Sequence, residues 1–409
     1  MSLTPYRRVL ALPGVGRLLL FAVLARVPAT ATGVVLTLHV VTGLHHGYAA
    51  AGVVGTAVTA GQGIGGPWRG RVVDRVGLRR SLVPSVVVAT ACWALAPFAS
   101  FAQLVVLAMV GGVLGVPVFT VVRQSLSVLV PEEQRRTAFS LDGMGTELSF
   151  MVGPAVGVIV ATQVSTGVAL LGLSAATLLV GLGLMAMNPA TRSAAEGTAP
   201  GEAGDAGERV ARAAWFTPRL VAVLAVAAGA TIVLAGTDVS VVAHLREHGA
   251  VELTGLVFVA WGAGSMIGGL VYGGVHRRVS PFLMLLVLAL LTVPVGLAPG
   301  PATLLLTILP AAALCAPVIA ATAEGVSRLV PEAARGEAMG WHGSALMVGS
   351  ALGAPLAGWM IDTEGAWSGF AAVGAAGMLV AAAGLLATRT RSTPRPPTPA
   401  ERVPVADRG

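Results

Sequence analysis

Long apolar runs separated by short polar segments make up most of the 409-residue chain. A helix needs about 20 apolar residues to cross the hydrocarbon core of a bilayer, and by that length the chain divides into twelve predicted spans. Those of the first half are residues 18–41, 49–68, 82–100, 104–122, 138–160 and 164–187. Those of the second half are residues 220–242, 253–272, 281–298, 302–321, 339–361 and 368–387. The pattern predicts an all-α integral membrane protein.

Two polar stretches set the domain boundaries. Residues 188–218 are rich in Ala, Gly, Glu and Pro and carry charges of both signs, a composition too polar to bury a core of its own. We predict a flexible cytoplasmic linker there, between a first six-helix bundle at residues 1–187 and a second at residues 219–388. Residues 389–409 are rich in proline and arginine and are expected to form a disordered cytoplasmic tail.

Composition supports a membrane class. The chain is 55% hydrophobic and 11% charged, far from the usage of soluble domains. Its formal charge is +7 and every basic side chain is arginine, since the sequence has no lysine. The arginines recur in short clusters between apolar runs rather than in one stripe, so a nucleic-acid partner is not expected. Such clusters are typical of cytoplasmic loops that face anionic lipid.

The arginine clusters also predict orientation. Segments that alternate with the spans on one side hold nearly all the basic residues, whereas the other side holds Arg246. Because positive residues favour the cytoplasmic side, both termini are expected in the cytoplasm of a cell that carries the chain as a multi-pass plasma-membrane protein.

A basic segment follows the second span. It is predicted to be a short loop, and its distinctive positions are Gly70, Asp74, Arg75, Gly77, Arg79 and Arg80. At this spacing and place the segment resembles the loop signature of the major facilitator superfamily. The resemblance implies two parallel six-helix bundles that work by alternating access, with the loop holding the halves together on the cytoplasmic side and releasing them when the protein opens inward. We expect this gating role for Asp74 and Arg75, whereas Arg79 and Arg80 are expected to act only as a positive-inside anchor.

The two halves repeat each other. Val130-Pro131-Glu132 and Val330-Pro331-Glu332 are identical and lie 200 residues apart. Six spans per half and a cytoplasmic linker give both halves the same orientation, as in transporters built from parallel repeats. The second copy of the basic loop is degraded, because Gly273 stands where Asp74 would be.

Few ionisable residues lie at bilayer depth, where such groups are costly and functional. At about 1.5 Å of rise per residue, Arg26 and Glu147 both lie near the midplane of their spans, the first and the fifth. The fold that the resemblance implies places these helices side by side, so we predict an Arg26–Glu147 pair facing the central cavity. It is either a fixed structural pair or a proton site in which Glu147 carries the proton. Asp142 lies nearer the cytoplasmic surface and is expected to be solvated or to meet the basic loop.

Small residues line the fifth span. They are Gly145, Gly153, Pro154 and Gly157, and they resemble the Gly-Pro motif of the family's proton-driven exporters. Close helix packing alone is the alternative, because Gly349, Gly353 and Pro355 form a similar surface in the eleventh span.

No phosphate-binding loop of the ATPase type is present, and without lysine none could form. By elimination, and by the resemblance to the major facilitator superfamily, a proton gradient is the energy source left. We predict a secondary transporter, not an enzyme, with no cofactor and no metal site. Its partners are a small-molecule substrate, protons and the lipid bilayer, and it is expected to act as a monomer. Export of a small, fairly apolar molecule is the first hypothesis. The alternatives are proton-coupled uptake of a metabolite and a non-transporting receptor or scaffold.

Overall fold

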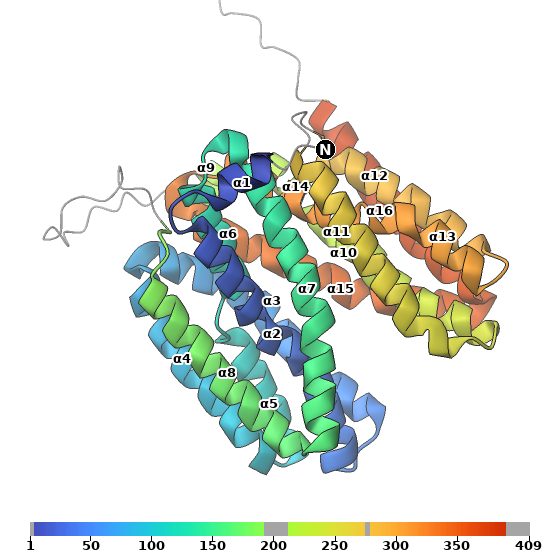
Figure 1. The fold of residues 1–409 in the computed structure, drawn as a ribbon, viewed down its shortest axis with the longest axis horizontal. Helices are drawn as coiled ribbons and strands as arrows, with labels where there is room; N and C mark the ends of the chain where they lie inside the picture. The colour runs from blue at the N-terminus through green and yellow to red at the C-terminus, as the bar shows by residue number, and fades with distance from the viewer. Residues whose placement is uncertain (1–3, 192–211, 275–278, 390–409) are drawn as a thin grey trace, which may run out of the picture.

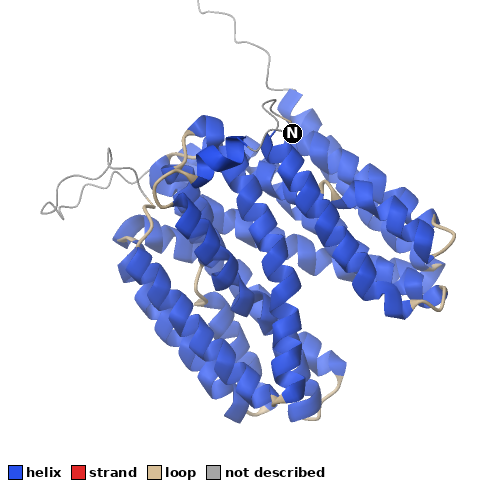
Figure 2. Ribbon diagram, viewed as in Figure 1, coloured by secondary structure: helices blue, strands red, loops and turns tan. Residues whose placement is uncertain are grey.

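A computed structural model describes residues 4–191, 212–274 and 279–389 of the chain. Within those residues all regular structure is helical (Figure 2). Ten helical segments among them are long and apolar enough to span a membrane. The predicted all-α membrane class is confirmed.

A helix lies at each predicted span of the first half, preceded by the short α1 (Thr4–Leu10). These helices are α2 (Val15–Leu38), α3 (Tyr48–Val76), α4 (Leu78–Leu95), the broken pair α5 (Phe101–Val113) and α6 (Val118–Leu129), α7 (Arg135–Gln163) and α8 (Thr166–Met187).

The second half follows the same order after the short α9 (Arg212–Trp215). Its helices are α10 (Pro218–Glu247), α11 (Thr254–Gly274), α12 (Pro281–Thr292), the broken pair α13 (Pro301–Ala312) and α14 (Cys315–Leu329), α15 (Arg335–Glu364) and α16 (Ala366–Arg389). Two predicted spans are not among the ten apolar segments. One is α3, which is rich in glycine, and the other is the shorter Pro281–Leu297. The arrangement fits twelve membrane crossings, and that α3 and Pro281–Leu297 each cross the membrane stays a prediction.

The Val-Pro-Glu repeat shapes the same corner in both halves. Val130 and Val330 have extended backbones, because a residue before proline is disfavoured in the helical region. A 3₁₀ turn follows each proline, and α7 and α15 then begin at Arg135 and Arg335. The helix neighbours repeat as well: α2 packs on α7 as α10 packs on α15, and α4 packs on α8 as α12 packs on α16.

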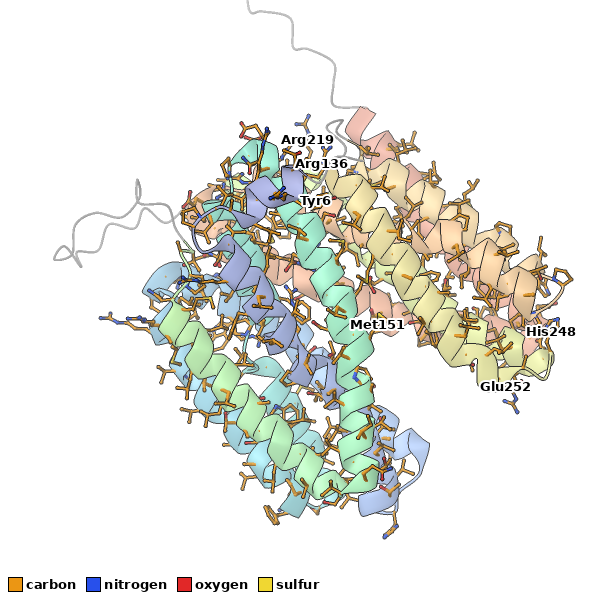
Figure 3. All side chains as sticks on the ribbon, viewed as in Figure 1. Tyr6, Arg136, Met151, Arg219, His248 and Glu252 are labelled. Atoms are coloured by element: carbon orange, nitrogen blue, oxygen red, sulfur yellow. The ribbon has the colours of Figure 1, made fainter. Side chains whose placement is uncertain are left out.

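The two bundles converge at one end and spread apart at the other (Figure 1). Figure 3 labels Tyr6, Arg136 and Arg219 at the end where they converge, and His248 and Glu252 at the far end of the second bundle. We call the first the closed end and the second the open end. Between the halves, α3 packs against α15, and α7 packs against α11 and α14.

Glycines let α7 approach α2 closely. A Cβ at Gly145 would lie 2.8 Å from Val23 Cγ2, and one at Gly153 would run into Thr30 Oγ1. Gly157 is equally tight, since its Cβ would lie 2.9 Å from Val35 Cγ2. The Thr30 hydroxyl donates to the Ser149 carbonyl across this contact at 2.8 Å.

The second half uses the same device. Gly349 and Gly353 of α15 lie against Thr231 and Ile232 of α10, and the Thr231 hydroxyl donates to the Leu346 carbonyl at 2.9 Å. Close packing therefore accounts for these glycines in both halves. An exporter-specific role for Gly145, Gly153, Pro154 and Gly157 stays a prediction.

Two predictions about polar segments are corrected. The basic segment at residues 70–80 is not a loop, because α3 continues to Val76 and the chain turns only at Gly77, whose φ of 82° favours glycine. The predicted linker lies partly outside the described residues, at 192–211, and so does the tail at 390–409. Residues 212–218 are not a flexible connector: α9 forms there, Trp215 is 3% exposed, and Phe216 packs edge-on against Trp341 of α15.

We expect Gly153→Ala to lower the apparent Tm of the protein in detergent. A methyl group there would force α2 and α7 apart, and overpacking costs about 1–3 kcal/mol. Gly172→Ala in α8 is the matched control, because a Cβ at Gly172 would meet nothing within 4 Å. Equal melting curves for the two variants would contradict the packing described here.

Candidate functional site

Asp74 joins the two halves at the closed end. Its carboxylate accepts hydrogen bonds from the backbone N–H groups of Gly336 at 3.1 Å and Glu337 at 2.8 Å, and from Gln124 Nε2 at 2.8 Å. Gly336 and Glu337 lie in the first turn of α15, whose N–H groups lack partners within the helix and whose dipole favours a negative charge. Asp74 of the first half therefore caps a helix of the second half. Gly70 allows the approach, since a Cβ there would run into the Gly336 carbonyl.

Arg71 adds an ion pair to this contact. Its Nε lies 2.8 Å from Glu337 Oε2 and its Nη2 lies 2.6 Å from Oε1. Arg212 of α9 contacts the same Oε1 through Nη2 at 2.5 Å. Neither arginine was predicted from the sequence to join the halves. Arg71 precedes Asp74 by three residues, a spacing that puts two side chains on one helix face, so the pair would have been found if the segment had been interpreted as helix.

The other arginines of this segment lie elsewhere. Arg75 is exposed and takes part in none of the ion pairs found among the described residues, so its predicted place in the gate is not supported by a contact. Arg79 Nε donates to the Met185 carbonyl within the first half at 2.9 Å, and Arg80 is exposed.

A second seal joins α7 to α11. The Thr137 hydroxyl donates to the Gly273 carbonyl at 2.7 Å, and the Ser140 and Tyr6 hydroxyls donate to the carbonyls of Gly269 and Leu270. Burial raises the pKa of Tyr6, which keeps its hydroxyl a donor. With glycine at position 273, this seal is made by hydroxyl donors and backbone carbonyls instead of a capping carboxylate.

An ion cluster supports the second seal. Arg136 Nε lies 3.5 Å from Glu324 Oε2, and Arg328 Nη2 lies 2.7 Å from Glu324 Oε1. The Tyr272 hydroxyl donates to the same carboxylate at 3.3 Å. Glu324 of the second half therefore binds an arginine from each half.

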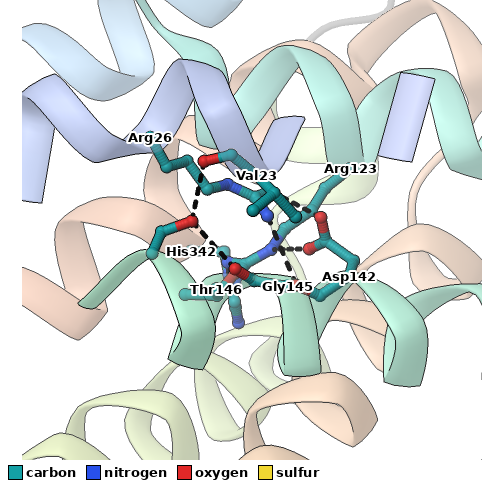
Figure 4. Close-up of polar contacts among 8 residues, drawn as sticks. Val23, Arg26, Arg123, Asp142, Gly145, Thr146 and His342 are labelled. Carbon is teal, nitrogen blue, oxygen red and sulfur yellow. Dashed lines mark hydrogen bonds and ion pairs between the residues drawn. The ribbon is translucent and has the colours of Figure 1, made fainter. Parts of the chain in front are cut away.

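A buried carboxylate shared by two arginines lies deeper in the first half (Figure 4). Asp142 Oδ1 is 2.5 Å from Arg26 Nη2, and its Oδ2 is 3.2 Å from Arg123 Nε. Arg26 is 0% and Asp142 1% exposed. The Arg26 guanidinium also lies over the Phe119 ring, 4.7 Å from its centroid, so α2, α6 and α7 meet at this point.

The predicted Arg26–Glu147 pair is not formed, and the prediction of a solvated Asp142 is wrong. Positions five residues apart lie about 140° apart around a helix axis, so Asp142 faces α2 and α6 whereas Glu147 faces the second half. Glu147 Oε1 accepts from Ser265 Oγ at 3.0 Å, and Ser265 Oγ accepts from the Ala316 N–H at 3.1 Å. Depth along a helix, on which the prediction was based, does not indicate which face of the helix each residue occupies.

The open end contains a cavity of ≈ 540 Å³. Its lining comes from α10, α11 and α15 and is mostly apolar: Asp238, Val239, Val242, Ala243, Arg246, Glu247, Phe258 and Ile361. Asp238 is close enough to Glu147 to interact with it electrostatically.

Metal ligands do not gather in the part of the chain that the structure describes: no group of three or more His, Cys, Asp or Glu side chains is arranged there to hold an ion. Cys92 and Cys315 are both free and buried.

The fold and the seals define a class of protein, and comparison with known proteins agrees. The model of the Major Facilitator Superfamily matches residues 18–324 and 276–408. The chain therefore belongs to this superfamily, whose members are membrane transporters rather than enzymes. No curated protein matches the sequence significantly.

Solved structures show the same fold. A bacterial homologue of the iron transporter ferroportin, in an outward-facing state, has a TM-score of 0.72 at 16% identity, covering 92% of this chain and 100% of that one. The E. coli fucose:proton symporter has a TM-score of 0.68 at 13% identity, covering 92% and 99%. The human organic anion transporter MFSD10 has a TM-score of 0.65 at 17% identity, again covering 92% and 99%. At such low identity these likenesses show the fold alone.

We expect Asp142→Asn to destabilise the protein strongly. The change leaves two buried arginines without a counter-charge, and breaking a buried pair in this way costs about 3–5 kcal/mol. Thermal unfolding in detergent measures the effect. Glu147→Gln is the control, since a glutamine oxygen still accepts from Ser265; a fall in Tm as large as that of Asp142→Asn would contradict the assignment.

We expect Asp74→Ala to open the closed end. Each N–H of α15 left unsatisfied costs about 1–3 kcal/mol, so the open-to-closed ratio should rise about tenfold or more. Spin labels at the exposed Arg80 and Arg219, in a background with Cys92→Ala and Cys315→Ala, report the distance between the halves. Arg79→Ala, whose partner Met185 lies in the same half, should leave the distances unchanged.

Proposed function

We propose that this transporter exports a small, largely apolar molecule across the plasma membrane in exchange for protons, by alternating access. The observation that carries the proposal is the combination of two seals at the closed end with a cavity at the open end. Among the described residues, the hydrogen bonds and ion pairs between the halves extend no farther toward the open end than Glu147–Ser265, which leaves the open ends of the bundles free to move.

Charge supports the orientation. Arginines gather at the closed end, for example Arg75, Arg80 and Arg219, whereas Arg246 lies at the open end. Since basic residues favour the cytoplasmic side, the closed end is cytoplasmic, both termini lie inside, and the structure represents an outward-open state.

The cavity lining supports the substrate class. Val239, Val242, Ala243, Phe258 and Ile361 offer apolar surface. Five of the eight lining residues are apolar, which favours a largely apolar molecule.

The charged side chains of the cavity lining bear on the charge of the substrate. The charged residues of the lining are two acids, Asp238 and Glu247, and one base, Arg246. An excess of acid in the lining disfavours an organic anion and favours a neutral or cationic substrate. The organic anions named for the human transporter are therefore a poor guide to this cavity.

Glu147 supports proton coupling. It is an intramembrane carboxylate on the face of α7 that meets the second half, and within the described part of the chain its hydrogen-bond partner is one neutral hydroxyl, that of Ser265. Acids at this depth typically mark proton or substrate paths. Protonation would add a donor to the Glu147 carboxyl group and so change its hydrogen bond with Ser265. A proton bound at Glu147 would therefore alter a contact between the two halves.

The test uses purified protein in proteoliposomes with an imposed pH gradient and a fluorescent lipophilic monocation. We expect the monocation to move against its gradient in exchange for protons, and an uncoupler to abolish the movement. Glu147→Gln should lose the pH-driven component, whereas Glu252→Gln, an exposed change at the open end, should keep it. Movement in the same direction as protons would favour uptake, and no gradient-driven flux would favour a receptor or scaffold.

A further inference from the structure

His342 links the two halves at the buried arginine cluster. Its Nδ1 lies 3.3 Å from Arg123 Nη1 of the first half, and its Nε2 lies 2.9 Å from Thr322 Oγ1 of α14. His342 is 0% exposed, and Figure 4 shows its contact with the cluster. The repeat gives the position meaning: Asp142 is seven residues into α7 and His342 is seven residues into α15. Arg123 thus lies between equivalent positions of the two halves.

The hydrogen-bond directions fix the state of this histidine. A guanidinium group has donors and no acceptor, so Nδ1 must accept from Arg123 and carries no proton. The proton of the neutral ring is on Nε2 and is donated to Thr322, whose hydroxyl donates in turn to the Ile319 carbonyl at 2.8 Å. The chain of donors from Arg123 to Ile319 is complete only when His342 is neutral.

A proton on His342 would break this arrangement. Nδ1–H would then point at another donor 3.3 Å away, and two cations would face each other in a buried site. The cluster already holds two arginines and one carboxylate, a net charge of +1. Like charges at this distance repel strongly where water is excluded.

Among the residues that the structure describes, no acid forms a hydrogen bond or ion pair with His342, whose ring contacts Arg123 and Thr322. The buried charged groups on α15 and on the helices around its first turns are Arg26 (α2), Arg69 and Asp74 (α3), Arg123 (α6), Arg136 and Asp142 (α7), Glu324 (α14) and Glu337 (α15). Glu147 (α7) and Asp238 (α10) lie farther toward the open end. Asp74 is bound to the N–H groups of Gly336 and Glu337, and Glu337 is bound to Arg71 and Arg212. The segment 366–386 of α16 carries no charge. Asp142 is bound to both arginines, and Glu324 is bound to Arg136 and Arg328.

We propose that His342 is a proton-binding residue of the transport cycle, and that its protonation breaks the Arg123–His342 contact and releases the two halves at the closed end. The proposal rests on the proton coupling proposed above and names a residue for it. The direction of this effect suits an exporter. His342 would take up a proton while the protein is open to the acidic side, and the protonated protein would then open toward the cytoplasm, where the proton leaves.

The experiment measures the closed-end distance between spin labels at Arg80→Cys and Arg219→Cys, in the background without Cys92 and Cys315 and in lipid nanodiscs. The pH is lowered from about 8 to about 5, the range in which histidine titrates. We expect the open-to-closed ratio of the parent to rise by about tenfold or more, the factor given by one pKa unit of difference between the two states.

His342→Asn is the decisive variant. An asparagine oxygen can accept from Arg123 and its amide can donate to Thr322, but the side chain cannot take up a proton. In His342→Asn we expect the same closed-end distance as in the parent at high pH, and no change in that distance when the pH is lowered. If this variant does not reach that distance, His342→Gln supplies the same donor and acceptor and the same result is expected of it.

Glu147→Gln separates the two proposals. If the parent's response persists in Glu147→Gln and is lost in His342→Asn, His342 is the group that releases the closed end. If the response is lost in Glu147→Gln and retained in His342→Asn, this inference is overturned while proton coupling stands. A response retained in both variants also overturns it, and a parent without any response overturns it together with the proton coupling on which it rests.

Discussion

One carboxylate, Asp142, compensates two arginines in a region from which water is excluded, and much of the first half is arranged to make that possible. Removing charge from water is costly unless the geometry of the pair is good, so α2, α6 and α7 must be held within hydrogen-bond reach of one another. The glycines of α7 supply the required closeness to α2. The break between α5 and α6 lets the second segment turn Arg123 toward Asp142. The small-residue surface and the ion cluster are therefore parts of one arrangement.

The two halves share the same helix arrangement but use different side chains to bind each other. Both halves use the same corner at Val-Pro-Glu, the same glycine-threonine contact and the same helix neighbours. Yet Asp74 caps α15 in one seal, whereas hydroxyls bind carbonyls near Gly273 in the other. The first seal is a carboxylate that caps a helix, whereas the second combines hydroxyl–carbonyl hydrogen bonds with the Arg136–Glu324 ion pair. The two interfaces can therefore respond differently to the same change in protonation.

Sequence reasoning found the features that periodicity and spacing encode. It found helices at the predicted spans, the repeat, the superfamily and the position of Asp74, because apolar length and a local motif are one-dimensional signals. It failed where a contact depends on which face of a helix a residue occupies. Arg26 and Glu147 were matched by depth, but Asp142 shares the face of α7 that meets α2. It also failed where a partner stabilises a conformation: Arg71 and Asp74 bind α15, and α3 stays helical through a stretch that looked like a loop. The burial of Trp215 could not be predicted, because no hydrophobic pattern surrounds it in the sequence.

Glu337 is held by two cations that belong to different parts of the molecule. Arg71 approaches from the first half, whereas Arg212 stands on α9, next to Trp215 and Phe216, and the latter packs on Trp341 of the same helix as Glu337. When the halves move apart, Arg71 departs with α3, and Arg212 remains beside the carboxylate. Both guanidinium groups contact Glu337 Oε1 in the structure, so loss of the Arg71 contact would leave the carboxylate paired with Arg212. Separation of the halves would therefore not strand an unpaired acid, which reduces the electrostatic cost of breaking this contact.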